Sequence, residues 1–207
     1  MSTHVINARN VNDALENGLW WLQVSGIKQE SRNGPVLVAP GPVVTEYRQP
    51  TERVLFTPGR DANPFFHFFE ALWMLAGRND LAFLEKFNPR MREFSDDGVT
   101  LAGAYGYRWR NAFNSDQLDD LISHLRDQPN SRRAVISMWN PNVDVHKANP
   151  IKDLPCNTTI YFGSGVGNRL DMTVLCRSND VLWGAYGANV VHFSYLHEYI
   201  TLSLGRE

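Results

Sequence analysis

One cysteine stands where it could act as a nucleophile. Cys156 follows Pro155 and precedes residues 158–162, which have the pattern of a β-strand. A thiol becomes an effective nucleophile when nearby cationic groups favour its ionised form. On position alone, a lone cysteine is more often a small buried hydrophobic residue. Cys176 fits that second role because it belongs to the alternating apolar set of another predicted strand.

Several arginines lie beside turns and strand ends, where they could converge on an anion. Arg32 is in a polar turn, Arg132 and Arg133 precede an apolar strand, and Arg177 follows another strand with Ser178 beside it. The planar guanidinium group suits phosphate oxygens, and several such groups can hold a dianion. Taken singly, each is more often an ordinary surface arginine, so both interpretations stay open.

Two other polar residues also allow a structural and a functional role. Glu70 lies in an almost wholly apolar segment, where a carboxylate is costly unless it is paired or functional. Its pKa could be raised enough for acid and base catalysis, or it could form a structural ion pair. Asn189 stands at a predicted helix start, where it could cap the helix or contact the edge of a base through its amide.

The overall composition limits the partners of this chain. Its 20 basic and 22 acidic residues give a net charge of -2, so no general basic field supports binding to nucleic acid. No apolar stretch reaches the roughly 20 residues that span a bilayer. Two cysteines do not make a disulfide framework, which favours a cytoplasmic protein. The six histidines show no metal-site spacing, and we expect no metal.

The elements that must position these residues form a mixture of helices and strands without regular alternation, which indicates the α+β class. Expected helices cover 12–24, 64–77, 116–127 and the stretch from about Asn189 onward. Expected strands cover 36–38, 43–48, 53–56, 134–139, 158–162 and 169–177. The helix from Pro64 is apolar over most of its circumference, so we expect it to be central. Residues 1–207 are expected to form a single domain.

Six segments, in order along the chain, resemble motifs of the thymidylate synthase family, which includes pyrimidine hydroxymethylases. They are Arg32 with Gly34; Glu70 to Leu75 with Gly77; Tyr105 to Arg110; Ser131 to Arg133 followed by Met138 to Pro141; Leu154 to Cys156; and Cys176 to Asp180 followed by Gly184 and Asn189. No single motif is decisive, but six in the family's order are highly specific. The resemblance implies a mixed β-sheet covered by helices, in a back-to-back dimer.

The resemblance also implies catalytic roles. Cys156 would add to carbon 6 of a pyrimidine nucleotide, so that carbon 5 attacks the methylene group of methylenetetrahydrofolate, the co-substrate. Glu70 would manage proton transfers through ordered water, and Tyr105 would lie beside the nucleophile. Asp180 and Asn189 would orient the base.

Binding roles follow from the same resemblance. Arg32, Arg177 and Ser178 would hold the phosphate. The arginine pair, Arg132 and Arg133, would reach across from a partner subunit, which implies a homodimer with shared active sites.

Several positions depart from the family's pattern. Asn157 replaces the histidine after the nucleophile, Arg108 replaces a glutamine, and one extra residue separates Gly184 from Asn189. Met91 falls near a tryptophan of the folate pocket, with Phe94 near a second. We also expect the chain to lack the C-terminal segment of family members, which would leave its active site incomplete.

The expected reaction is conversion of dUMP to dTMP through a covalent adduct on Cys156. One alternative is a dUMP or dCMP hydroxymethylase on the same scaffold, which Met91 and Asn157 favour because both replace groups that would hold the folate and exclude water. A second alternative is a non-catalytic homologue that binds a nucleotide.

Overall fold

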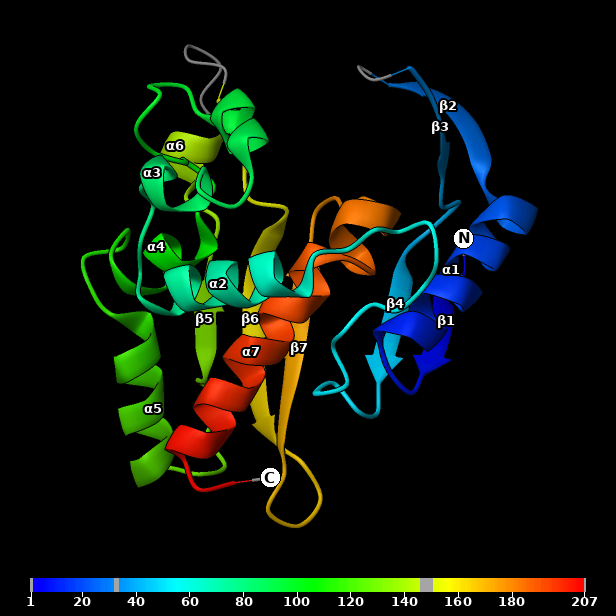
Figure 1. Ribbon diagram of the computed structural model, residues 1–207. Helices are drawn as coiled ribbons and strands as arrows, with labels where there is room; N and C mark the ends of the chain where they lie inside the picture. Colours follow the sequence, from blue (N-terminus) through cyan, green and yellow to red (C-terminus); the bar gives the residue numbers. More distant parts are fainter. Residues whose placement is uncertain (1, 32–33, 146–150, 207) are drawn as a thin grey trace. The chain divides into compact units, whose positions relative to one another are not determined.

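The computed structural model describes residues 2–31, 34–145 and 151–206 (Figure 1). Arg32, the residue expected in the phosphate loop, lies outside these residues. The chain divides into two compact units. Unit 1 comprises Met1–Pro64 and Asp180–Ser194, and unit 2 comprises Phe65–Asn179 and Tyr195–Glu207. None of the described helices is long and apolar enough to cross a membrane.

Unit 1 packs a helix against a pair of parallel strands. The helix α1 (Val11–Ser25) begins after Asn10, whose side chain accepts hydrogen bonds from two amides of the first turn. Strand β1 (His4–Ala8) pairs in parallel with β4 (Val43–Tyr47), and β2 (Ile27–Ser31) pairs antiparallel with β3 (Gly34–Val38). The apolar side of α1 completes the core with Ile6, Ala8, Val11, Ala14, Leu15, Leu55 and Tyr186.

The strand expected at 53–56 is wrong. This segment has no regular secondary structure and joins no sheet. Its backbone instead binds the side chain of Asn12 in α1, which donates to the Val54 carbonyl at 2.9 Å and accepts from the Phe56 amide at 2.8 Å. A side-chain amide therefore satisfies the polar groups that a neighbouring strand would otherwise bind.

Unit 2 contains a three-stranded antiparallel sheet in the order β5-β6-β7. Its strands, β5 (Val135–Ser137), β6 (Asn157–Ser164) and β7 (Leu170–Cys176), confirm the three strands expected in this region. On one face, Ile136, Ile160 and Val174 lie side by side; the two isoleucines are buried and Val174 is half-buried. The opposite face leaves Val135, Tyr161 and Leu175 between 38% and 45% exposed. The described strands thus divide among three small sheets.

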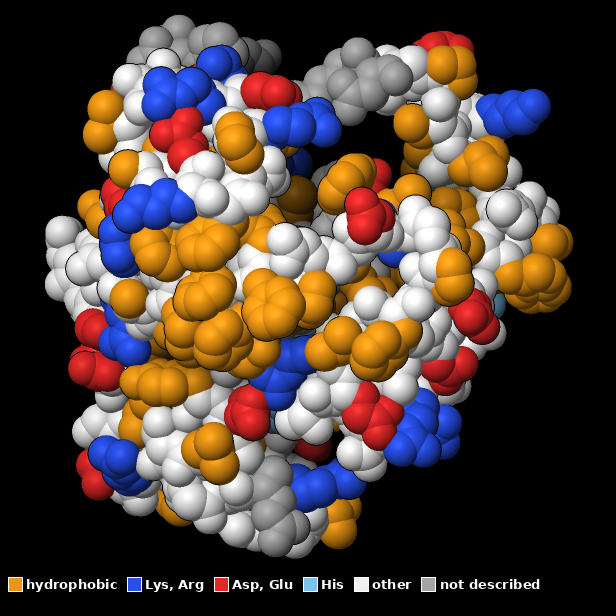
Figure 2. Space-filling model, viewed as in Figure 1, with side chains coloured by type: hydrophobic (Ala, Val, Ile, Leu, Met, Phe, Trp, Pro, Cys, Tyr) orange, Lys and Arg blue, Asp and Glu red, His pale blue; other side chains and the backbone are white. Residues whose placement is uncertain are grey.

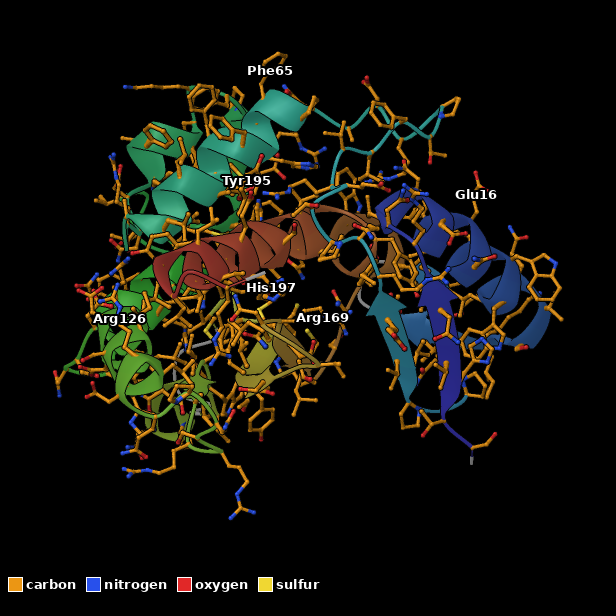
Figure 3. All side chains as sticks on the ribbon, turned by 90° about the horizontal axis from the view of Figure 1, so that it is seen from below. Glu16, Phe65, Arg126, Arg169, Tyr195 and His197 are labelled. Carbon is orange, nitrogen blue, oxygen red and sulfur yellow. The ribbon has the colours of Figure 1, made fainter. Side chains whose placement is uncertain are left out.

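Helix α7 (Ala188–Ser203) covers the sheet of unit 2 with its second half (Figures 1 and 3). Figure 3 shows Tyr195 on the side of α7 towards α2 (Pro64–Leu75) and His197 on the side towards the strands. The ring of Tyr195 lies 5.9 Å from that of Phe68, and His197 Nε2 lies 2.7 Å from the Leu170 carbonyl. Helix α7 therefore fixes α2 over the sheet.

Helix α2 is only partly buried within unit 2. Its inward side carries Glu70, Ala71, Trp73 and Met74, which are buried. Phe65 is 74% exposed, and Phe68 and Leu72 are 39% and 45% exposed. Figure 2 shows the resulting apolar surface over α2. The helix expected to be central is thus buried on one side, whereas part of its apolar circumference is exposed among the described residues.

Short helices connect these elements. They are α3 (Leu81–Leu84), η1 (Pro89–Phe94), α4 (Tyr105–Arg110), α5 (Gln117–Asp127), α6 (Pro141–Asp144) and, in unit 1, η2 (Val181–Ala185). Of these, only α5 was predicted, and Asp116 caps it by accepting from two amides of its first turn.

A buried ion pair joins α4 to α6. Two nitrogens of Arg108 donate to the two carboxylate oxygens of Asp144 at 2.7 and 2.8 Å, and both side chains are at most 6% exposed. Arg108 also donates to the carbonyls of Ala102 and Met138, while Asp144 accepts from the Asn140 amide. The arginine that replaces the family's glutamine therefore fixes the Trp-Asn-Pro turn.

We expect Arg108→Gln to lower the free energy of unfolding by about 3–5 kcal/mol, because it leaves the buried Asp144 carboxylate without its cation. Chemical denaturation at neutral pH measures this loss. The double variant Arg108→Gln/Asp144→Asn should recover part of the stability, because it removes the uncompensated charge. Equal stability of Arg108→Gln and the unchanged protein would contradict the role of this pair.

Candidate active site

The segment that carries Cys156 is held by the residue that follows β7. The Arg177 amide donates to the Cys156 carbonyl at 2.9 Å, and Arg177 Nε donates to the Pro155 carbonyl at 3.1 Å. The guanidinium carbon also lies 5.1 Å from the centre of the Trp139 ring. A cation therefore lies against the nucleophile segment, where it favours negative charge on nearby atoms. Ser178, the next residue, is exposed.

Tyr105 is the first residue of α4 and lies beside both cysteines. The side chain is 8% exposed, and burial raises the pKa of its phenol. Negative charge on Cys156 or Cys176 raises this pKa further, whereas the amides of Asn157 and Cys156 act in the opposite direction. The phenol is therefore kept neutral next to Cys156, where it can donate a hydrogen bond but does not readily act as a base.

The two cysteines have different surroundings. Burial, followed by the effect of Cys156, raises the pKa of Cys176 to about 11. Cys176 is paired with Asn157 across the sheet and lies on its covered side. This environment agrees with the apolar role expected for Cys176, whereas the half-buried Cys156 lies at the strand entry.

Asn157 is fully buried at the start of β6. Its Nδ2 donates to the carbonyls of Thr159 at 3.1 Å and Leu175 at 2.7 Å. These bonds bridge a register shift between β6 and β7 at residues 157–159. Its Oδ1 has no hydrogen-bond partner within the described part of the chain. The residue that replaces the family's histidine therefore serves the backbone at a β-bulge.

Glu70 is 8% exposed on the inward side of α2, in the same unit as Cys156. Its negative charge acts on Asp153, which lies three residues before Cys156. Glu70 therefore stays a prediction for acid-base catalysis, on the inward side of a helix in the unit that holds Cys156. Sequence reasoning missed Asp153, although an acidic residue so close to the nucleophile was a visible signal.

The arginine pair is exposed at the start of β5. The Arg133 amide donates to Ser131 Oγ at 3.2 Å, and that hydroxyl lies 2.6 Å from His124 Nε2. Neither Arg132 nor Arg133 forms an ion pair within the described residues. Both guanidinium groups are therefore open to an anion or a partner subunit.

Met91 and Phe94 both lie on η1. Side chains three residues apart share one side of a 3₁₀ helix, so the two can line the same surface. Met91 is half-buried and Phe94 is 47% exposed. This surface thus carries the Met91 thioether and the Phe94 ring at the positions where the resemblance implies two tryptophans of the folate pocket.

Asp180 and Asn189 belong to unit 1, whereas the other candidate residues that the structure describes belong to unit 2. Asp180 Oδ1 accepts from the amides of Leu182 and Trp183 at 2.8 and 2.7 Å, so it caps η2. Asn189 is the second residue of α7 and not its N-cap. The cap interpretation thus applies to Asp180, which was expected only to orient the base.

A family model described as thymidylate synthase matches residues 60–207, which is more than half of the chain. The chain belongs to the thymidylate synthase family. The family match covers five of the six motifs, among them the nucleophile segment and the arginines around it, so the resemblance identified the family correctly.

Two relatives are similar to most of this chain. The chain is 54% identical over 203 residues to a protein of Pseudomonas phage M6 named deoxyuridylate hydroxymethyltransferase, covering 98% of this chain and 57% of that protein. A protein of the same name from Bacillus phage SP01 is 41% identical over 176 residues, covering 80% of this chain and 45% of that protein. The chain therefore spans about half the length of these relatives.

The fold also matches a solved structure. Thymidylate synthase from T4 phage superposes with a TM-score of 0.58 at 22% identity, covering 68% of this chain and 53% of the other. This likeness supports the thymidylate synthase fold expected for the chain.

We expect iodoacetamide to alkylate Cys156 much faster than Cys176 near neutral pH, because Cys176 has a pKa of about 11 and stays a thiol. At pH values below this pKa, the rate of Cys176 labelling should rise about tenfold for each unit by which the pH is increased, since only the thiolate reacts. Peptide mass spectrometry measures both rates. Cys156→Ser and Cys176→Ser are the matched controls, and faster labelling of Cys176 at neutral pH would refute the distinction.

Proposed function

We propose that this chain carries the nucleophile of a deoxyuridylate hydroxymethyltransferase, which transfers a one-carbon unit from methylenetetrahydrofolate to carbon 5 of dUMP. The main support is the arrangement of Cys156 between Tyr105 and Arg177. The relatives from Pseudomonas phage M6 and Bacillus phage SP01, both named for this reaction, support the choice of product. They favour the hydroxymethylase alternative over the dTMP product that the motif set alone suggests.

The chemistry assigned to this chain begins with the Cys156 thiolate. Its addition to carbon 6 of the pyrimidine makes carbon 5 nucleophilic, and carbon 5 then forms a bond to the one-carbon unit. Loss of the carbon 5 proton to a base then breaks the bond between the one-carbon unit and the folate, which departs as tetrahydrofolate and leaves an exocyclic double bond at carbon 5. Water adds to the exocyclic carbon, and Glu70 accepts the proton that this water loses. Elimination of Cys156 releases the nucleotide. Tyr105 stays a neutral hydrogen-bond donor beside the sulfur throughout.

Folate would be held beside η1, which carries Met91 and Phe94. A hydride route to a methyl group needs the folate to stay pressed against the nucleotide with water excluded. A flexible thioether at Met91 holds the folate less rigidly than an aromatic wall, so water competes more readily. The composition of η1 therefore supports the hydroxymethyl product.

The identity of the base is a separate matter. The side-chain amide of Asn189 suits uracil better than cytosine.

The phosphate would be bound by arginines from two subunits. Arg177 contacts the segment that carries Cys156, whereas Arg132 and Arg133 are exposed at the start of β5. Val135, Tyr161 and Leu175 give that face an apolar surface suitable for back-to-back pairing. A homodimer with shared active sites combines both observations.

A mixture of Cys156→Ala and Arg132→Ala/Arg133→Ala chains tests this dimer. Each variant alone should be inactive, and mixing should restore up to about a quarter of the activity, because half of the chains form heterodimers that each hold one intact site. Activity after co-refolding is the measurement. Absence of recovery, while size-exclusion chromatography shows dimers, would exclude shared sites.

We expect a covalent adduct when the protein is incubated with 5-fluoro-dUMP and methylenetetrahydrofolate, because fluorine replaces the carbon 5 proton whose loss expels the folate, so the adduct cannot break down. Intact-mass spectrometry detects the adduct, and Cys156→Ser should abolish it while Cys176→Ser keeps it. With dUMP, the expected product carries a hydroxymethyl group and no dihydrofolate forms. A methylated product with dihydrofolate would select thymidylate synthesis instead, and turnover of dCMP alone would select a cytosine substrate.

A further inference from the structure

Trp139 lies in the turn between β5 and α6, outside the residues that handle the nucleotide or the folate in the proposed function. The centre of its ring lies 5.1 Å from the guanidinium carbon of Arg177, the residue that follows β7. A cation within about 6 Å of a ring centre is attracted by the electrons of the ring face. Both residues belong to unit 2. The contact therefore connects the turn after β5 with the arginine that lies against the Cys156 segment.

Uncharged groups hold Arg177 in place. Its Nε donates to the Pro155 carbonyl at 3.1 Å, and the Trp139 ring lies against its guanidinium group. In the part of the chain that the structure describes, no carboxylate pairs with Arg177, and its two terminal nitrogens have no hydrogen-bond partner. The charge of Arg108, by contrast, is paired with Asp144. A carbonyl and a ring thus orient the exposed Arg177 without neutralising it.

The position of the Trp139 ring is set by backbone hydrogen bonds on both sides of the residue. The amides of Met138 and Trp139 donate to the Thr158 carbonyl at 3.0 and 3.3 Å. On the other side, the Asn140 amide donates to the Asp144 carboxylate at 2.8 Å. Trp139 itself is half-buried. The ring therefore has a fixed position, against which the longer and more flexible arginine side chain packs.

A restrained arginine binds an anion at a lower cost than a free one. A free arginine side chain loses rotamer freedom when it binds, and this loss weakens the complex. Its planar guanidinium group also meets two oxygens of a phosphate at once only in suitable orientations. A ring that restrains the group before the ligand arrives lowers the first cost and selects the orientation.

We propose that Trp139 is a positioning residue that acts through Arg177 and strengthens the binding of a nucleotide monophosphate relative to the nucleoside. This inference rests on the proposed function, in which Arg177 binds the phosphate of dUMP. The ring and the Pro155 carbonyl direct the terminal nitrogens of Arg177, which keep their full charge for the phosphate. The phosphate does not react, so its contacts are the same before and during bond formation. Trp139 therefore acts on the affinity for the nucleotide more than on the turnover rate.

A purely structural role makes a different prediction. If the ring only fills space, Trp139→Leu weakens the binding of dUMP and of deoxyuridine alike. If the ring acts through Arg177, Trp139→Leu should weaken dUMP binding about tenfold and change deoxyuridine binding, which involves no phosphate, by less than about twofold. Trp139→Phe keeps a ring face, so its affinity for dUMP should stay within about threefold of the unchanged protein. Isothermal titration calorimetry measures these affinities.

A double-mutant cycle with Arg177→Ala decides whether Trp139 acts through this arginine. In the Arg177→Ala background, Trp139→Leu should change the affinity for dUMP by less than about twofold. An equal loss with and without Arg177 would overturn the proposal, and so would an unchanged affinity of Trp139→Leu for dUMP. Phe83→Leu is the matched control, because it removes another ring that contacts an arginine of unit 2, Arg78 at 4.8 Å. If the leucine variant does not fold, Trp139→Met takes its place, because methionine fills irregular space.

Two measurements separate this inference from the proposed function. The 5-fluoro-dUMP adduct tests the function in the unchanged protein, whereas inorganic phosphate, followed by phosphorus NMR, tests the anion site without a base. If the adduct forms but the cycle shows no dependence on Arg177, only the role of Trp139 is overturned. If dUMP neither binds nor forms the adduct, the proposed function is refuted, and the same cycle with inorganic phosphate decides the role of Trp139. Phosphate binding that does not depend on Trp139 through Arg177 would then overturn that role as well.

Discussion

The position of Cys156 depends on how β6 pairs with β7. The pairing brings the Cys156 carbonyl to the Arg177 amide, so the residue before β6 and the residue after β7 are held together. A shift of one residue would turn every side chain of β6 to the other face of the sheet. The covered face would then lose Ile160 and Phe162, which are 0% and 4% exposed. Burial of these apolar residues thus fixes the register, and the register fixes the nucleophile.

The neighbours of the nucleophile are arranged around this pairing. Tyr105 approaches from α4, whose far end is tied through Arg108 to α6 and the Trp139 turn. The Trp139 ring in turn faces the Arg177 guanidinium. Arg177 is therefore linked both to the strand pairing, through Cys156, and to the buried ion pair of Arg108 and Asp144, through the turn that carries Trp139. An arginine at position 108 is compatible with a site that usually has glutamine there, because its charge is paired with Asp144 and it supports the turn that contacts Arg177.

The sequence predicted the regions in which periodicity is strong. Strands β5 to β7 and helices α1, α2, α5 and α7 have clear apolar patterns, and their existence is confirmed. The error at 53–56 arose because a side chain outside the segment, Asn12, binds its backbone. The candidate site came mainly from motif order. Asp153 belongs to none of these motifs, and its hydrogen bond to the Gly103 amide, 50 residues away, and its burial could be seen only in the folded chain.

The β-bulge at Asn157 limits which residues can occupy position 157, including the histidine that the family usually has there. One amide nitrogen supplies two hydrogens to two backbone carbonyls, at Thr159 and Leu175. A neutral histidine has a single ring N–H, so it cannot serve both carbonyls from this position. Exchange of these residues therefore requires a compensating change in the backbone between the two strands. Evolution at position 157 is coupled to the local strand geometry, and a single-codon reversion would meet a structural barrier.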